Sequence, residues 1–212
     1  MRKDGHNPVL IVIAGPNGSG KTTVTSQLLK SDWLEDAIYI NPDIIANEKF
    51  GDWNSPDSVR NAAVYCSEIR EECLVQRKSI IFETVMSAPD KIDFIRRAKD
   101  AGYFVRLFFI STNNPTINAA RIARRVMKGG HDVPITKIIS RYSKSILNCC
   151  DIAQEVDRLY VYDNSADDMP IQPLFRLTDG ILGKMYVKSL PDWASNILPE
   201  NEIQIQDSEI SD

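Results

Sequence analysis

The chain has 212 residues, with 25 lysines and arginines against 29 aspartates and glutamates, a formal net charge of −4. Its 43% of hydrophobic residues is typical of a globular chain with a sizeable core, and the weakly acidic balance disfavours nucleic-acid binding through overall positive charge. No apolar run approaches the roughly 20 residues of a membrane-spanning helix, and the polar start, Met1–His6, is unlike a secretion signal, so we expect a cytoplasmic protein with no membrane partner.

Short apolar runs alternate with longer helical patterns along the chain, which is typical of βα units and a mainly parallel sheet. The apolar runs are nearly continuous, as in strands that are buried on both faces. We expect five strands, at Val9–Ala14, Ala37–Ile40, Ser79–Glu83, Tyr103–Ile110 and Leu159–Asp163. We expect helices at Gly20–Lys30, Pro56–Arg77 and Pro89–Ala101; two of them begin at a proline, which needs no hydrogen-bond donor at the first helical position.

The region after the fifth strand predicts a β-hairpin at about residues 173–188, turning at Asp179-Gly180. The last stretch, residues 199–212, has five acidic residues and no lysine or arginine, so we expect a solvated, disordered tail. Because no repeat or linker divides the remainder, residues 1–198 are expected to form one domain. The four cysteines, Cys66, Cys73, Cys149 and Cys150, include no CxxC pair, which favours reduced thiols.

The strongest motif is the phosphate-loop pattern G-x-x-x-x-G-K-[ST], which residues 15–22 match at every fixed position. A predicted strand precedes the loop and a helix follows it, so its N–H groups converge on the phosphates of a nucleoside triphosphate. Lys21 is expected to reach the β- and γ-phosphates, and the Thr22 hydroxyl is expected to hold Mg²⁺. The expected nucleotide-binding residues here are Gly15, Asn17, Gly18, Ser19, Gly20, Lys21, Thr22 and Thr23.

This motif and the order of elements predict the fold class and the cofactors. We expect an α/β P-loop NTPase, a three-layer sandwich with a mainly parallel five-stranded sheet, that uses ATP and Mg²⁺. The chain contains neither the [NT]-K-x-D tetrapeptide that reads guanine in GTPases nor an L-S-G-G-Q-like signature of transporter ATPases. A compact kinase remains as the favoured class.

Three acidic residues, Asp43, Glu83 and Asp163, close predicted strands. The ligand crevice of an open α/β sheet lies beyond the carboxyl ends of its strands, so these acids are candidates for the site. Asp43 is suited to accept the proton of an acceptor hydroxyl, and Glu83 to orient the substrate. The alternatives are a helix N-cap for Asp43 and a buried ion pair for Glu83, and for Asp163 a simple turn is favoured.

Residues 115–145 carry seven cations and one acid, a local charge of +6 against −10 for the rest of the chain. The pattern reads as two helices joined by a glycine-containing turn, Lys128–Pro134, and predicts a helical lid over about residues 115–150. Lid arginines supply positive charge to a transferring phosphoryl group and exclude water. The alternatives are a solvated basic helix face and, less favoured, a nucleic-acid groove, because no aromatic residues interleave the charges. His131, at the turn, is a further candidate for contact with the phosphates.

Taken together, these segments resemble the zeta-toxin family of phosphate-loop kinases over roughly residues 8–165. The resembling segments are the phosphate loop, Asn41-Pro42-Asp43, Phe82-Glu83-Thr84, Arg121–Val126, Gly129–Pro134 and Ile139–Tyr142.

The resemblance implies ATP-dependent phosphorylation of a small-molecule hydroxyl, typified by UDP-N-acetylglucosamine, and a neutralising antitoxin on a separate chain. It implies that Lys21 and Thr22 bind phosphate and Mg²⁺, that Asp43 is the catalytic base, and that Glu83 and Thr84 contact the acceptor. Arg124 or Arg125 is then the catalytic lid arginine, with Arg141 as an alternative. His131 stands where related toxins carry a second arginine. The rival readings are a regulatory ATP-binding or ATPase protein that acts on a protein partner and, less favoured, a nucleic-acid end kinase.

Overall fold

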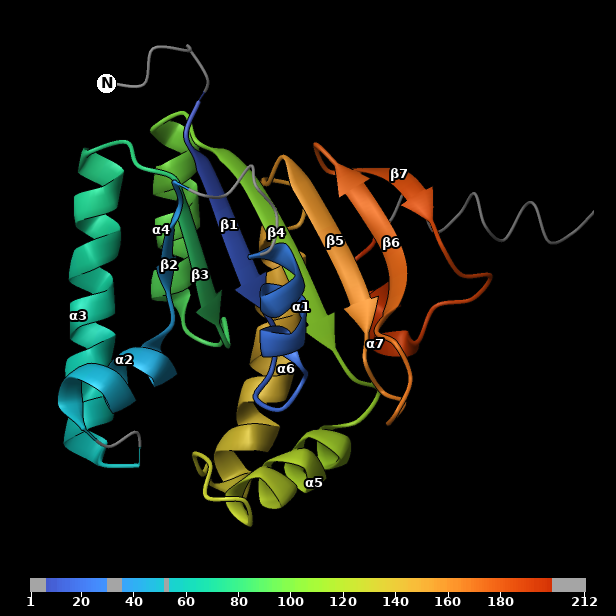
Figure 1. The fold of residues 1–212 in the computed structure, drawn as a ribbon. Coiled ribbons are helices and arrows are strands. Elements are labelled where there is room, and N and C mark those ends of the chain that lie inside the picture. The colour runs from blue at the N-terminus through green and yellow to red at the C-terminus, as the bar shows by residue number, and fades with distance from the viewer. Residues whose placement is uncertain (1–6, 30–35, 52–53, 200–212) are drawn as a thin grey trace, which may run out of the picture.

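The computed structural model describes residues 7–29, 36–51 and 54–199, which form an α/β sandwich around one sheet (Figure 1). The sheet has seven strands in the spatial order β2-β3-β1-β4-β5-β6-β7. The strands are β1 (Val9–Ala14), β2 (Ile38–Ile40), β3 (Ile80–Thr84), β4 (Phe104–Ser111), β5 (Arg158–Asp163), β6 (Gln172–Thr178) and β7 (Ile181–Met185). The first five strands in the spatial order pair in parallel, and β6 and β7 continue the sheet as an antiparallel hairpin.

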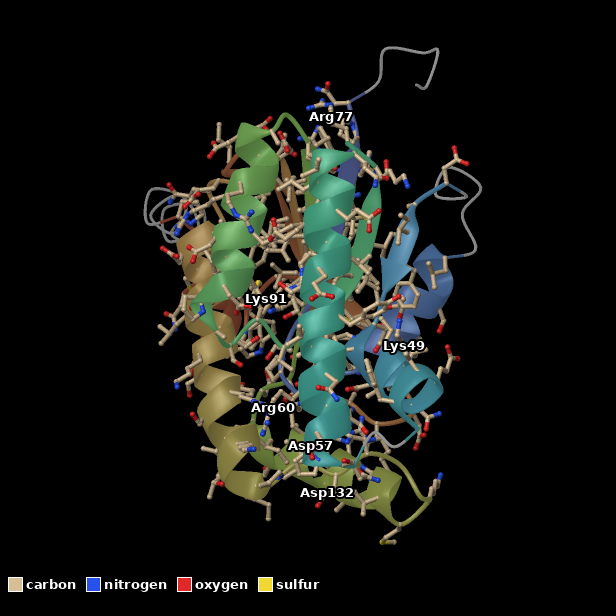
Figure 2. The ribbon with its side chains drawn as sticks, turned by 90° about the vertical axis from the view of Figure 1, so that its left-hand side faces the viewer. Lys49, Asp57, Arg60, Arg77, Lys91 and Asp132 are labelled. Atoms are coloured by element: carbon tan, nitrogen blue, oxygen red, sulfur yellow. The ribbon has the colours of Figure 1, made fainter. Side chains whose placement is uncertain are left out.

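Helices cover both faces of this sheet. Within the described ranges they are α1 (Lys21–Leu28), α2 (Pro42–Phe50), α3 (Pro56–Val75), α4 (Pro89–Asp100), α5 (Pro115–Val126), α6 (Ile135–Ile152) and α7 (Asp192–Ser195). α1 lies on one face, whereas α4 and α6 lie on the other, with α3 beside α4 (Figures 1 and 2). None of these helices is long and apolar enough to cross a bilayer.

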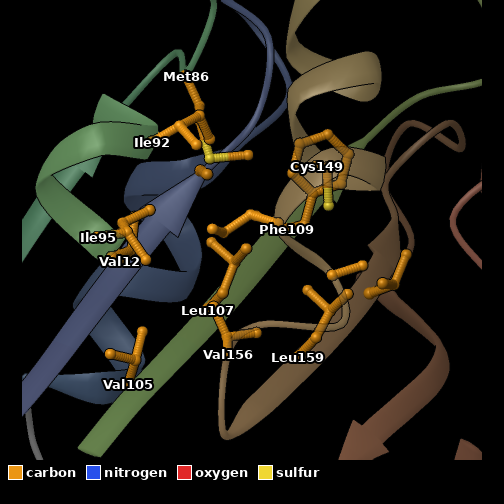
Figure 3. Packing of buried hydrophobic residues seen from close by; sticks show 14 of the residues in the cluster. Val12, Met86, Ile92, Ile95, Val105, Leu107, Phe109, Cys149, Val156 and Leu159 are labelled. Carbon is orange, nitrogen blue, oxygen red and sulfur yellow. The ribbon is translucent and has the colours of Figure 1, made fainter. Parts of the chain in front are cut away.

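Strand β1, in the middle of the five parallel strands, is buried on both faces because its alternate side chains enter two different clusters. Val12 belongs to the larger cluster, which α3, α4, α6 and α7 share with the sheet, and Ile11 and Ile13 belong to the smaller cluster toward α1. In Figure 3, Phe109 of β4 lies beside Cys149 of α6 in the larger cluster. Each fully buried side chain of this size contributes about 1.5–3 kcal/mol, so the sheet core dominates stability.

The sequence-based expectations for the sheet are confirmed. All five predicted strands form and pair in parallel, and the predicted hairpin turns at Asp179-Gly180, where both residues have positive φ. The hairpin joins the same sheet, which raises the strand number from five to seven. The four cysteines are free thiols, as predicted. Residues 200–212 of the predicted tail lie outside the described residues.

The predicted lid segment contains two helices that pack differently along their length. Ile122 of α5, Val133 of the connecting turn and Ile138 of α6 form a small cluster of their own. The later part of α6, from Tyr142 to Ile152, packs into the main core. α5 and the start of α6 therefore lie at the carboxyl ends of the parallel strands, beyond the main core (Figure 1).

Candidate active site

The phosphate loop, residues 15–22, runs from the end of β1 into α1 and depends on glycine at two tight contacts. Gly15 has φ +147°, and a Cβ there would lie 1.9 Å from the carbonyl oxygen of Ile110. Gly20 has φ +95°, and its Cβ would lie 2.2 Å from Nδ2 of Asn164. Only glycine fits such contacts with positive φ, so this loop wraps as the motif predicts.

Two amides from other parts of the chain hold the loop in place. Nδ2 of Asn118, from α5, donates to the carbonyl oxygen of Asn17 at 2.6 Å, and Nδ2 of Asn164 donates to that of Ser19 at 2.8 Å. The Ser19 hydroxyl is buried and has no hydrogen-bond partner among the described residues. A shaped loop with an unpartnered hydroxyl and an adjoining helix N-terminus fits the phosphates of a nucleotide.

Lys21 is held against the loop itself. Its Nζ donates to the carbonyl oxygens of Gly15 at 2.9 Å and Pro16 at 3.0 Å. Burial lowers the pKa of Lys21 to about 8, and the carboxylates of Glu83 and Asp43 oppose this shift. Because the charged amine is poorly solvated, an anion beside it is strongly favoured.

We expect nucleotide binding to weaken as the pH rises above about 8, because the amine of Lys21 then loses its proton in the protein without nucleotide. Phosphate beside the amine favours the charged form, so the complex holds a proton that the free protein has released. The dissociation constant of a non-hydrolysable ATP analogue should rise several-fold between pH 7.5 and 9, approaching about tenfold per pH unit. Isothermal titration in buffers of different ionisation enthalpy should show proton uptake. A constant affinity over this range would contradict the assignment, and Lys21→Arg, which stays charged, is the control.

Asp43 and Glu83 both lie at the edge of the sheet where the parallel strands end, but Asp43 is exposed and Glu83 is buried. Asp43 is exposed in the first turn of α2, whose N-cap is Asn41, so the alternative of Asp43 as N-cap is wrong. Glu83 is buried at the end of β3, and its Oε1 accepts hydrogen bonds from Thr25 Oγ1 and Tyr39 Oη, both at 2.7 Å. Its described partners are therefore hydroxyl groups, whereas the alternative reading expected an ion pair.

Asp163 belongs to a turn, as the favoured reading predicted. Its Oδ1 accepts from the backbone N–H of Ser165 at 2.9 Å, and its Oδ2 accepts from the hydroxyl of Ser165 at 2.8 Å. The turn fixes the segment after β5, which carries the loop-supporting Asn164.

One cleft of about 420 Å³ brings most of the predicted site residues together. Those that line it are Asn17, Gly18, Gly20, Lys21, Thr22, Asp43, Glu83, Thr84, Arg125 and His131. Gly15 and Ser19 are buried within the loop, and Thr23 faces a neighbouring pocket with Tyr162 and Asn164. Val85 and Ser87, in the segment between β3 and α4, and Lys91, in the first turn of α4, also line the cleft.

The structure separates the two adjacent lid arginines. Arg125 lines the cleft, and its Nε and Nη2 donate to the carbonyl oxygen of His131 at 3.1 and 2.8 Å. Arg124 does not line this cleft; its Nη2 donates to Asp167 Oδ2 at 2.8 Å. Of the two candidates, only Arg125 is placed to meet a ligand in the cleft.

Two further arginines line the cleft. One is Arg141, which the sequence analysis gave as the alternative lid arginine. Its Nη1 lies 3.4 Å from Oδ1 of Asn17. Arg121 was missed; its Nε and Nη2 donate to Asp167, while its buried Nη1 has no partner among the described residues. Hydrogen bonds from Arg124 and Arg121 hold the pKa of Asp167 below its usual value. The spacing of Arg121 and Arg125, one helical turn apart, was the signal that could have identified the pair.

The turn between α5 and α6 reaches the opposite wall of the cleft. Oδ1 of Asn54, just before α3, lies 3.3 Å from Nδ1 of His131 and accepts from the backbone N–H of Asp132 at 3.1 Å. Asp132 and Asp57 of α3 accordingly appear at the same end of the molecule in Figure 2. The cleft is thus bounded by α2 and α3 on one side and by α5 and α6 on the other.

Comparison with known proteins identifies the family to which this chain is related. The chain matches the family model described as Zeta toxin over residues 1–169. An uncharacterised protein of Haemophilus influenzae is 29% identical over 136 residues, 62% of this chain and 91% of its own length.

Solved structures share the fold at low sequence identity. The complex of AvrRxo1-ORF1 with AvrRxo1-ORF2 and sulphate ions gives a TM-score of 0.66 at 17% identity, covering 93% of this chain and 66% of that chain. The same pair with ATP gives 0.63 at 16% identity, covering 96% and 75%. A structure of the PezAT chromosomal toxin-antitoxin system of Streptococcus pneumoniae gives 0.61 at 15% identity, covering 98% and 88%. The chain thus spans about two thirds of the length of the first of these.

Because the family model matches most of the chain, and the fold and phosphate loop agree with it, this protein belongs to the zeta toxin family of P-loop kinase-like proteins.

Proposed function

We propose that this protein is a Mg²⁺- and ATP-dependent kinase that phosphorylates a hydroxyl group of a small molecule, with a UDP-N-acetylglucosamine-like nucleotide sugar as the acceptor. One observation carries the proposal: a single cleft joins the phosphate loop, the exposed carboxylate of Asp43 and the lid residue Arg125. These are the parts that phosphoryl transfer to a hydroxyl requires, namely phosphate binding, a base and positive charge.

In this proposal the phosphate loop and Lys21 bind the triphosphate of ATP. Thr22, exposed at the start of α1, would hold the Mg²⁺, which would supply positive charge to the phosphates. Asp43 accepts the proton of the acceptor hydroxyl as the hydroxyl oxygen bonds to the γ-phosphorus. The bond from that phosphorus to the β,γ-bridging oxygen breaks, and ADP leaves. Arg125 stabilises the charge on the transferring group.

The acceptor occupies the half of the cleft opposite the lid. Glu83 and Thr84 stand at the end of β3 and line the same cleft as Asp43, and the apolar residues Val59 and Val85, neither of them buried, also line it. Carboxylate and hydroxyl groups bind a sugar, and apolar side chains pack on its ring or on a base. These features support an acceptor with both a polyhydroxyl part and a flat apolar part.

A separate antitoxin chain is also part of the proposal. Family membership supports it, as do the structural relatives, one of which contains AvrRxo1-ORF2 while another comes from a toxin-antitoxin system. Co-purification with the product of a neighbouring gene would test it.

The decisive experiment is a product analysis by mass spectrometry. The protein would be incubated with Mg²⁺, ATP and, in parallel, UDP-N-acetylglucosamine, N-acetylglucosamine, UDP or a 5′-hydroxyl oligonucleotide. The proposal predicts a gain of one phosphoryl group on UDP-N-acetylglucosamine that depends on ATP. ATP hydrolysis at the same rate without any acceptor would instead indicate a regulatory ATPase, and a phosphorylated oligonucleotide would indicate an end kinase.

A further inference from the structure

A continuous chain of hydrogen bonds lies behind the two acids of the cleft, with Asn41 at its centre. Oδ1 of Asn41 accepts from the backbone N–H groups of Asp43 at 2.9 Å and Ile44 at 3.3 Å. Nδ2 of Asn41 donates to the hydroxyl of Tyr39 at 2.9 Å, and that hydroxyl donates to Oε1 of Glu83 at 2.7 Å. One amide therefore joins the helix turn that presents Asp43 to the carboxylate of Glu83.

The orientation of this amide is fixed by its own partners. Two backbone N–H groups point at one end of the Asn41 side chain, so that end must be the oxygen. The NH₂ end then has to face Tyr39, and the phenol donates its own proton onward. Burial is the main cause that raises the pKa of Tyr39, so the phenol keeps this proton at neutral pH. All bonds run in the same direction, toward Glu83.

The chain also determines which oxygen of Glu83 is available to a ligand. Oε1 accepts a second hydrogen bond, from Thr25 Oγ1 at 2.7 Å, whereas no described residue donates to Oε2. Glu83 lines the cleft, so Oε2 is the oxygen left for the acceptor. Asn41 and Glu83 are both buried, at 9% and 7% exposure, where a lost partner leaves a polar group unsatisfied and a neighbour displaced.

We propose that Asn41 is a positioning residue that couples the two acids of the site: through its oxygen it fixes the turn that carries Asp43, and through its amide and Tyr39 it aims Glu83 at the acceptor. This coupling rests on the proposed kinase function. It explains why a buried asparagine and a half-buried phenol stand where a simple helix cap needs only one oxygen.

The first test uses Asn41→Ser, which retains an N-cap oxygen for α2 but loses the amide donor, and Tyr39→Phe, which removes the donor to Glu83. Each should lower kcat for UDP-N-acetylglucosamine phosphorylation about 10- to 100-fold, as expected for a misaligned reactant, with the KM for ATP within about twofold. The double variant should lose no more than the worse single variant, because both break one chain. Wild-type kcat in Asn41→Ser, or losses that multiply in the double variant, would overturn the proposal.

Asn114→Ser is the matched control. Asn114 is the N-cap of α5, and its Oδ1 accepts from the N–H of Thr116 at 2.9 Å, without any link to the acids. This variant should keep its activity, which separates the coupling from a general effect of replacing a helix cap.

A second measurement is independent of activity. In a crystal structure of Asn41→Ser, the Tyr39 hydroxyl should no longer lie within hydrogen-bond distance of Oε1 of Glu83, and the carboxylate should turn. An unchanged Tyr39–Glu83 pair would overturn the proposal whatever the activity. If wild-type protein phosphorylates no acceptor while this change occurs, the proposed function is wrong and the coupling of the two acids stands.

Discussion

Replacing Asp43 with asparagine is expected to reduce phosphoryl transfer about 10³-fold while leaving the affinity for ATP nearly unchanged. The substitution keeps the size of the side chain and its place in the first turn of α2, but an amide cannot accept the acceptor proton. Nucleotide affinity depends on the phosphate loop, which Asp43 adjoins but does not form. Steady-state kinetics and titration with an ATP analogue would measure the two quantities separately.

The chain offers a close control for this variant in Asp57. It is the second residue of α3, directly after Pro56, just as Asp43 follows Pro42 in α2. Asp57 is exposed, pairs with Arg60 at 3.8 Å and does not line the cleft, so Asp57→Asn should retain full activity. A wild-type rate in Asp43→Asn, or an equal loss in Asp57→Asn, would remove Asp43 from the role of base.

The second large effect distinguishes Arg125 from Arg124. Arg125→Ala should lower kcat by about 10³-fold, because an arginine that meets the transferring group stabilises charge that appears only in the transition state. Arg124→Ala should change kcat less than about threefold, because its guanidinium forms an exposed ion pair with Asp167 and does not reach the cleft. Such an exposed ion pair contributes only about 0–1 kcal/mol to stability.

Both variants lie on the same helix, and thermal unfolding should show similar stabilities for them. If Arg124→Ala lowered kcat more than Arg125→Ala did, α5 would have to rotate about its own axis during catalysis, so that Arg124 faced the cleft. If neither variant affected kcat, the lid would serve binding alone.

Local patterns explain why much of the fold was predictable. A buried parallel strand is a short apolar run whose character depends on its own residues, so β1, β4 and β5 were found within one or two residues. The phosphate loop is likewise specified by consecutive residues, since its glycines are required by local backbone geometry. A helix after β2 entered only as the alternative for Asp43, with its start two residues late, although Asn41 before Pro42 is a recognisable start for a helix. The short α7 was not predicted.

The sequence by itself determined the phosphate loop, the parallel strands and the acids that lie at the ends of β3 and β5 or shortly after β2, because each depends on neighbours within a few positions. Only the tertiary structure decided which lid arginine faces the cleft, since that depends on how α5 is rotated when Ile122 packs against Val133 and Ile138. The same packing presents Arg121 and Arg125 to the cleft and leaves Arg124 with Asp167. The link from Asn41 through Tyr39 to Glu83 joins β2, α2 and β3, and residues 44 positions apart become partners only when the sheet has formed.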